Sequence, residues 1–184
     1  MGMRVSFELD DEDLRHFRLI MRQSRKAAAR LSPEDIVALS EQLLQKVGSG
    51  RIPQFVRERL ARLQVMIDML VDHEWRLPGT ETARVLNALV YFCEPEDLIP
   101  DHIPGLGFLD DAIMIELVVR ELRHEIEAYE DFCDFRDQRG PKSGVKARSS
   151  DMNREQWLKD RRKHLQARMR KRRQSGANKP LRLL

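Results

Sequence analysis

The chain has 184 residues, enough for one domain with a sizeable hydrophobic core and an appendage. Its formal net charge of +3 hides a strong asymmetry, because residues 139–184 hold 16 of the 33 Lys and Arg but only 3 of the 30 Asp and Glu. No apolar run has the ~20 residues of a spanning helix or the form of a signal peptide, so we expect a soluble cytoplasmic protein. Cys93 and Cys133 form no C-x-x-C pair and are expected to stay reduced.

Apolar residues at helical spacing predict about five helices ahead of the basic tail. The second begins at Ser32, an N-cap residue followed by Pro33 at the first helical position, and ends at Gly48, a C-cap residue. The first helix is expected to follow the acidic run 10–13, and the other four are expected to cover roughly 33–47, 53–75, 81–93 and 110–136. No segment shows the alternation of a strand. The predicted fold class is all-α, a compact bundle of about five helices with a basic C-terminal arm that is helical or disordered.

The composition divides the chain into three parts. Residues 1–138 form the predicted helical domain, residues 139–150 a linker of mainly Gly, Pro, Ser, Lys and Arg, and residues 151–184 the basic arm. The strong apolar stripes all lie before Arg139, whereas the arm has only a thin one. We therefore expect a chain that ends at Arg139 to fold by itself.

The segment between the fourth and fifth predicted helices mixes three prolines, two glycines and four aspartates with large apolar residues. Its pattern, P-x-D-L-I-P-D-x-I-P-x-L-G-x-L-D-D, resembles the signature of the YkvA-like family, a bacterial domain of unknown function (domain of unknown function 1232). The resemblance covers about residues 80–120 and implies no activity. The motif residues, expected to be structural with a functional role left open, are Pro95, Asp97, Pro100, Asp101, Pro104, Gly105, Gly107, Asp110 and Asp111.

The aspartates of this motif allow two interpretations. Hard cations need several converging oxygen atoms, which a turn held by prolines can supply, so a metal-dependent enzyme is one alternative function. The prolines also force short turns, and each new helix leaves backbone N–H groups that a short carboxylate can accept. We favour this capping role. Asp110 is then the expected N-cap of the fifth helix, with Leu109 and Met114 forming a hydrophobic staple, and no metal is predicted.

Two further spacings raise the question of a metal enzyme. Glu121 and His124 form a Glu-x-x-His pair, as in di-iron helical bundles, and Asp13 and His16 form a similar pair with aspartate. The charged neighbours of both pairs favour a solvated helix face instead. The sequence has no G-x-S-x-G, P-loop, dinucleotide-binding glycine pattern or zinc-type cysteine spacing. We therefore predict no catalytic residues and no cofactor, although the unknown function of the family leaves enzymatic activity open.

The basic arm carries the densest charge of the chain. Within residues 161–173 there is no acidic residue, and like charges at i, i+3 and i, i+4 destabilise an isolated helix, so the free arm is expected to fray. The residues predicted to bind a polyanion are Arg161, Arg162, Lys163, Arg168, Arg170, Lys171, Arg172 and Arg173.

Three kinds of partner fit this arm. The favoured one is nucleic acid, bound through its phosphate backbone without sequence specificity, because Trp157 is the arm's single aromatic residue and base stacking needs more. The second is an anionic membrane at the inner face, with Trp157, Leu158, Leu165 and Met169 at the interface. The third is an acidic protein surface, including the acidic end of the chain's own body.

Overall fold

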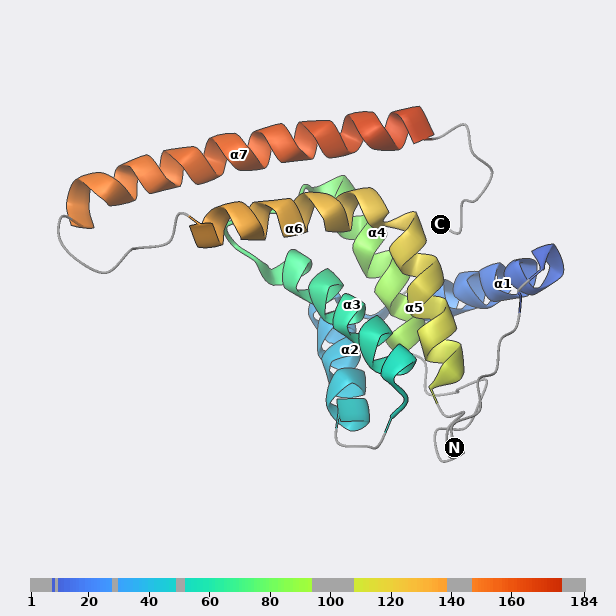
Figure 1. The fold of residues 1–184 in the computed structure, drawn as a ribbon. Helices are drawn as coiled ribbons and strands as arrows, with labels where there is room; N and C mark the ends of the chain where they lie inside the picture. Colours follow the sequence, from blue (N-terminus) through green and yellow to red (C-terminus); the bar gives the residue numbers. More distant parts are fainter. Residues whose placement is uncertain are drawn as a thin grey trace, which may run out of the picture.

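The computed structural model of the chain describes residue 8 and residues 10–27, 30–48, 52–93, 108–138 and 147–176. These residues form helices and no strand, so the predicted all-α class is confirmed (Figure 1). The elements in chain order are α1 (Asp11–Ala27), α2 (Pro33–Gly48), α3 (Gln54–Val71), α4 (Gly79–Leu89), the 3-10 turn η2 (Val90–Cys93), α5 (Leu109–Glu121), α6 (Arg123–Gln138) and α7 (Ala147–Gly176).

The first two helices begin with reciprocal caps. The side chain of Asp10 accepts hydrogen bonds from the backbone N–H groups of Glu12 and Asp13 at 2.7 and 3.0 Å. At α2 the backbone N–H of Asp35 donates to Ser32 Oγ and that of Ser32 to Asp35 Oδ2, both at 3.1 Å. Such a capping box satisfies backbone donors that a helix start leaves open. The predicted cap at Ser32 is confirmed.

The predicted helix over 110–136 is two helices in the structure. α5 ends at Glu121, and Leu122 leaves the helical conformation with φ −95° and ψ 13° before α6 begins. Figure 1 shows the two helices running in different directions from this point. Leu122 is itself fully buried, so the bend places an apolar side chain in the core instead of continuing the helix into solvent.

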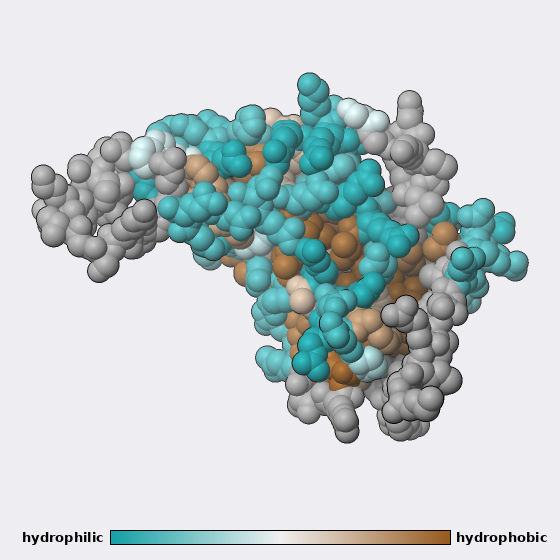
Figure 2. Space-filling view, in the orientation of Figure 1, coloured by the Kyte–Doolittle hydropathy of each residue, from teal (hydrophilic) through white to brown (hydrophobic). Residues whose placement is uncertain are grey.

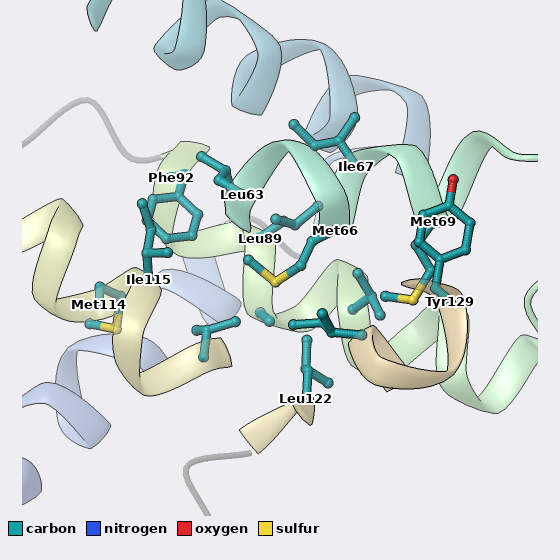
Figure 3. Packing of buried hydrophobic residues seen from close by; sticks show 14 of the residues in the cluster. Leu63, Met66, Ile67, Met69, Leu89, Phe92, Met114, Ile115, Leu122 and Tyr129 are labelled. Carbon is teal, nitrogen blue, oxygen red and sulfur yellow. The ribbon is translucent and has the colours of Figure 1, made fainter. Parts of the chain in front are cut away.

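The core lies where α3, α4 and α5 meet. Leu63, Met66 and Ile67 of α3 are at most 1% exposed, and they pack in one buried cluster with Leu89 of α4 and Ile115 of α5 (Figure 3). Each side chain of this size that leaves water contributes roughly 1.5–3 kcal/mol to folding. α4 buries one apolar face in this core through Val85, Ala88 and Leu89.

The last helix, α7, is long and lies along α6 (Figure 1). It begins at Ala147 inside the predicted linker, because residues 147–150 contain no Gly or Pro to stop it. Its Leu158, Leu165 and Met169 are buried and belong to the main core. The prediction that the core ends before Arg139 was therefore wrong. These three residues recur every four to seven positions, and this thin stripe suffices because α6 covers it.

Hydrophilic residues cover most of α6 and α7 on the face seen in Figure 2. Among the residues that the structure describes, no helix has the length and apolar character needed to cross a membrane.

Candidate functional site at the junction of α7 with the body

Most of the sequence motif lies outside the described residues. This holds for Pro95, Asp97, Pro100, Asp101, Pro104, Gly105 and Gly107. Asp110 and Asp111 are described, and both are buried, at 3% and 5% exposure.

Asp110 is not the N-cap of α5, contrary to the prediction. The helix begins one residue earlier than expected, and its N-cap is Phe108, whose backbone is left-handed at φ 66° and whose carbonyl accepts the N–H of Ala112 at 3.0 Å. Asp110 and Asp111 therefore lie in the first helical turn, where the positive end of the helix dipole stabilises carboxylates. Leu109 is already helical, so the predicted staple with Met114 does not form at this start.

Of the residues considered for a metal site, Glu121 pairs with an arginine. Glu121 Oε1 accepts a hydrogen bond from Arg84 Nη2 at 3.3 Å. Burial, and then the charge of Arg123, lowers the pKa of His124. Within the described ranges, no three His, Cys, Asp or Glu side chains are placed to hold a metal ion together.

A buried ion cluster joins α7 to the body, by which we mean the described residues before 139. Glu81 in the first turn of α4 and Glu125 in the first turn of α6 are 1% and 0% exposed. Arg173 Nη1 of α7 lies 3.2 Å from Oε1 of both carboxylates. The full cluster consists of Glu81, Arg84, Glu121, Glu125, Arg170 and Arg173.

Two further arginines, Arg84 and Arg170, lie beside the same two carboxylates. Arg84 Nε lies 3.4 Å from Glu125, and Arg170 Nε lies 3.4 Å from Glu81. The second oxygen of each buried carboxylate, Oε2, has no hydrogen-bond partner among the described residues. A buried carboxylate without full solvation depends strongly on nearby positive charge. Three arginines therefore stabilise the negative charges of these two glutamates, and two of the three belong to α7.

A row of more exposed ion pairs runs along the same interface. Arg172 Nη1 lies 2.7 Å from Glu127 Oε2, and Arg168 pairs with Asp131. Toward the start of α7, Arg154 Nη1 lies 2.9 Å from Glu74 Oε1, so ion pairs with the body occur near both ends of this helix. Exposed pairs of this kind contribute only ~0–1 kcal/mol each, so they orient α7 more than they hold it.

The turn between α3 and α4 is the third part of the junction. Arg162 Nη1 donates to the carbonyl of Glu74 at 2.7 Å, and Gln166 Nε2 donates to the carbonyls of Trp75 and Arg76 at 3.0 and 3.2 Å. Arg76 has a left-handed backbone at φ 49°, which is uncommon for a residue with a side chain. α7 thus supplies hydrogen-bond donors to three backbone carbonyls of this turn.

Asp72 fixes the same turn from the body side. Its Oδ1 accepts the backbone N–H groups of Glu74 and Trp75 at 2.8 and 3.0 Å, and its Oδ2 accepts Arg136 Nη1 at 2.6 Å and the hydroxyl of Tyr129 at 3.1 Å. Burial alone would raise the pKa of Asp72, but these hydrogen bonds outweigh it and lower the pKa. Burial also raises the pKa of Tyr129 and that of Cys133.

Asp72→Asn is expected to destabilise the fold by about 2 kcal/mol near neutral pH, since hydrogen bonds to a charged group are lost. The lowered pKa of Asp72 stabilises the folded state above the ordinary value of 3.8, and this stabilisation disappears as the pH falls through the folded-state pKa. The stability difference between wild type and variant, measured by urea unfolding, should therefore be constant above about pH 5 and shrink below about pH 4. A difference that stays constant on acidification would contradict this role of the carboxylate.

The arginines and the lysines of α7 differ in their contacts with the body. Arg154, Arg162, Arg168, Arg170, Arg172 and Arg173 all contact the body. Lys159, Lys163 and Lys171 are exposed, and no ion pair reaches them within the described ranges. Arginine forms planar, multiple hydrogen bonds at interfaces, whereas the ammonium group of lysine is strongly hydrated. Of the residues predicted to bind a polyanion, Lys163 and Lys171 are exposed and form no ion pair with any described residue. The arginines are engaged with the body, and Arg161 stacks its guanidinium 5.3 Å from the Phe135 ring.

The described residues thus form an all-helical module in which the basic helix α7 covers the acidic side of the body. Within it, residues 83–117 match the family described as Protein of unknown function (DUF1232), which confirms the resemblance predicted from the motif. The chain is also similar to the "Uncharacterized membrane protein YkvA" of Bacillus subtilis (strain 168), at 44% identity over 43 residues. The match covers 23% of this chain and 41% of that relative, so the chain spans less than half of the relative's length. No solved structure matches the chain significantly.

Proposed function

We propose that the chain is a helical interaction module whose docked basic helix binds an anionic surface through its lysines. The observation that carries the proposal is the division of charge on α7, where arginines are paired with the body and Lys159, Lys163 and Lys171 are exposed without ion pairs in the described structure. Unpaired cations on a helix that is anchored along its length attract phosphate groups without a cost for ordering the helix.

An anionic membrane surface is the partner that we favour. Arginine is preferred for recognising nucleic acid phosphates through paired hydrogen bonds, and the arginines of α7 are engaged inside the protein. Lysines that act as point charges suit the diffuse negative potential of anionic lipids. The similar Bacillus subtilis protein is named a membrane protein, and Trp157 of α7 is 47% exposed. Aromatic residues of this kind are common at membrane interfaces.

This binding differs from the mode expected from the sequence. Leu158, Leu165 and Met169 are buried against the body and do not face an interface with lipid. α7 would therefore lie on the headgroups and would not insert its apolar stripe, unlike a free amphipathic helix. Binding of this kind should fall steeply with salt.

Nucleic acid, the favoured partner in the sequence analysis, is the second candidate function. Lys159 and Lys163 lie one turn apart and Lys171 two turns further along, on a helix of 30 residues. A straight helix of that length extends ~45 Å, which is enough to follow several phosphates of a duplex. Three lysine contacts to B-DNA would give a slope of log K against log salt of about −3.

The test uses the full-length chain and a triple variant, Lys159→Gln, Lys163→Gln and Lys171→Gln. Removing three charges should weaken binding to vesicles that contain phosphatidylglycerol on the order of a hundredfold, measured by co-sedimentation over a salt series. The matched triple Lys→Arg variant keeps the charge and should bind like wild type. A glutamine variant that binds vesicles normally but loses duplex DNA would favour nucleic acid. Unchanged binding to both would rule out the proposal.

A further inference from the structure

The first helix carries a second cationic surface. After its acidic first turn, residues 14–30 contain six Lys or Arg and no acidic residue. Phe17 and Met21 are buried and hold α1 on the body, where it contacts η2. Figure 1 shows α1 projecting from the edge of the bundle.

The exposed side of α1 forms a single stripe. Its members, Arg15, Leu19, Arg22 and Lys26, follow the spacing i, i+4, i+7 and i+11, which places them on one face of a helix. All four are exposed, and the stripe extends over ~17 Å at 1.5 Å per residue. We call these four residues the α1 stripe.

The cations of the α1 stripe are not neutralised by the body. No ion pair is formed by Arg15, Arg22 or Lys26 with any described residue, and Arg15 donates only to the carbonyl of Asp11, at 3.1 Å. The arginines of α7 are in the opposite situation, since acidic residues of the body meet them. Arg15 also lies close enough to Asp10 for its charge to lower the pKa of that carboxylate, whereas Arg22 and Lys26 have no acidic partner among the described residues.

An exposed leucine lies within this charge. Leu19 is 52% exposed and is flanked along the helix by Arg15 and Arg22. A duplex nucleic acid offers phosphates to the arginines but no apolar layer to the leucine. A bilayer surface offers both, because lipid phosphates lie directly above the upper acyl carbons.

We infer that the α1 stripe binds an anionic lipid bilayer, with Arg15, Arg22 and Lys26 on the headgroup phosphates and Leu19 at the acyl boundary. Each cation near such a surface strengthens binding about fivefold, so three of them supply on the order of a hundredfold. The buried contacts of Phe17 and Met21 keep the helix in place, and the stripe needs no unfolding to reach the lipid. This site goes beyond the α7 surface proposed above and does not depend on it.

The experiment compares two charge variants of the full-length chain that each lose three positive charges. One carries Arg15→Gln, Arg22→Gln and Lys26→Gln, and the other is the α7 triple Lys→Gln variant. Binding is measured to vesicles of phosphatidylcholine with and without phosphatidylglycerol, and to duplex DNA. The α1 variant should lose on the order of a hundredfold in affinity for the anionic vesicles and little for DNA.

Leu19→Ser tests the apolar part of the α1 stripe, and Val71→Ser is its control. Leu19 is 52% and Val71 50% exposed, so both lose a similar apolar surface, but Val71 lies at the end of α3. Leu19→Ser should weaken vesicle binding severalfold, most visibly at high salt, whereas Val71→Ser should leave it unchanged.

Each outcome decides between the two surfaces. Loss in the α1 variant with normal binding of the α7 variant supports the α1 stripe and contradicts the function proposed for α7. Normal vesicle binding of the α1 variant overturns the inference, as does a wild-type chain that ignores anionic vesicles. A loss of DNA binding alone would assign the α1 stripe to nucleic acid and overturn the lipid assignment.

Discussion

Leu165→Ala is expected to lower the free energy of unfolding by about 2–5 kcal/mol, the usual cost of removing a fully buried leucine side chain. Leu165 is 0% exposed and lies in the core that α7 shares with the body. The measurement is equilibrium urea unfolding followed by circular dichroism. Leu19→Ala is the matched control, because the same side chain is removed from a position that is 52% exposed, and it should change stability by no more than about 0.5 kcal/mol.

The same packing reverses the expectation that a chain ending at Arg139 folds by itself. That truncation would remove Leu158, Leu165 and Met169 together and uncover the body surface beneath them. The shortened chain should unfold with lower cooperativity or aggregate on heating. If it melts like the full-length chain, and Leu165→Ala has no effect, then α7 does not dock in solution and the arm predicted from the sequence is the better description.

Local signals in the sequence determine much of the fold. The caps at Asp10 and Ser32 and the apolar stripes of α2, α3 and α4 depend on neighbouring residues, and the structure has helices at these positions. The break at Leu122 could not be predicted in this way. The apolar pattern continues through it without Gly or Pro, and the bend exists because Leu122 enters a core formed by distant helices.

The junction with α7 could be predicted only in outline. The opposite charges of body and arm made the body's acidic end one of three predicted partners of the arm, and Glu125, Glu127 and Asp131 do pair with arginines of α7. The pairing of Arg173 with Glu81 joins residues that are far apart in the sequence, and no periodicity connects them. The different contacts of arginine and lysine on α7 were also missed. A count of charges treats arginine and lysine as equal. The stronger hydration of the lysine ammonium group was the signal that could have separated them.

Arg173→Gln is expected to destabilise the protein by about 3 kcal/mol, the lower end of the cost of breaking a buried ion pair. The variant removes the guanidinium that lies 3.2 Å from both Glu81 and Glu125, which are 1% and 0% exposed. Arg84 and Arg170 remain beside the carboxylates, so the loss should not reach the upper end of the range, near 5 kcal/mol.

The control is the neighbouring Arg172→Gln, because Arg172 pairs with Glu127 on the surface and both side chains are about half exposed. It should cost at most about 1 kcal/mol in the same urea unfolding experiment. A further variant, Arg173→Gln with Glu81→Gln, removes a buried charge together with its partner and should recover part of the lost stability. Equal effects of the two single arginine variants, or no recovery in the double variant, would mean that the buried carboxylates do not depend on α7. In that case α7 would be held by its apolar residues alone, and a polyanion could compete for Arg173 as readily as for the exposed lysines.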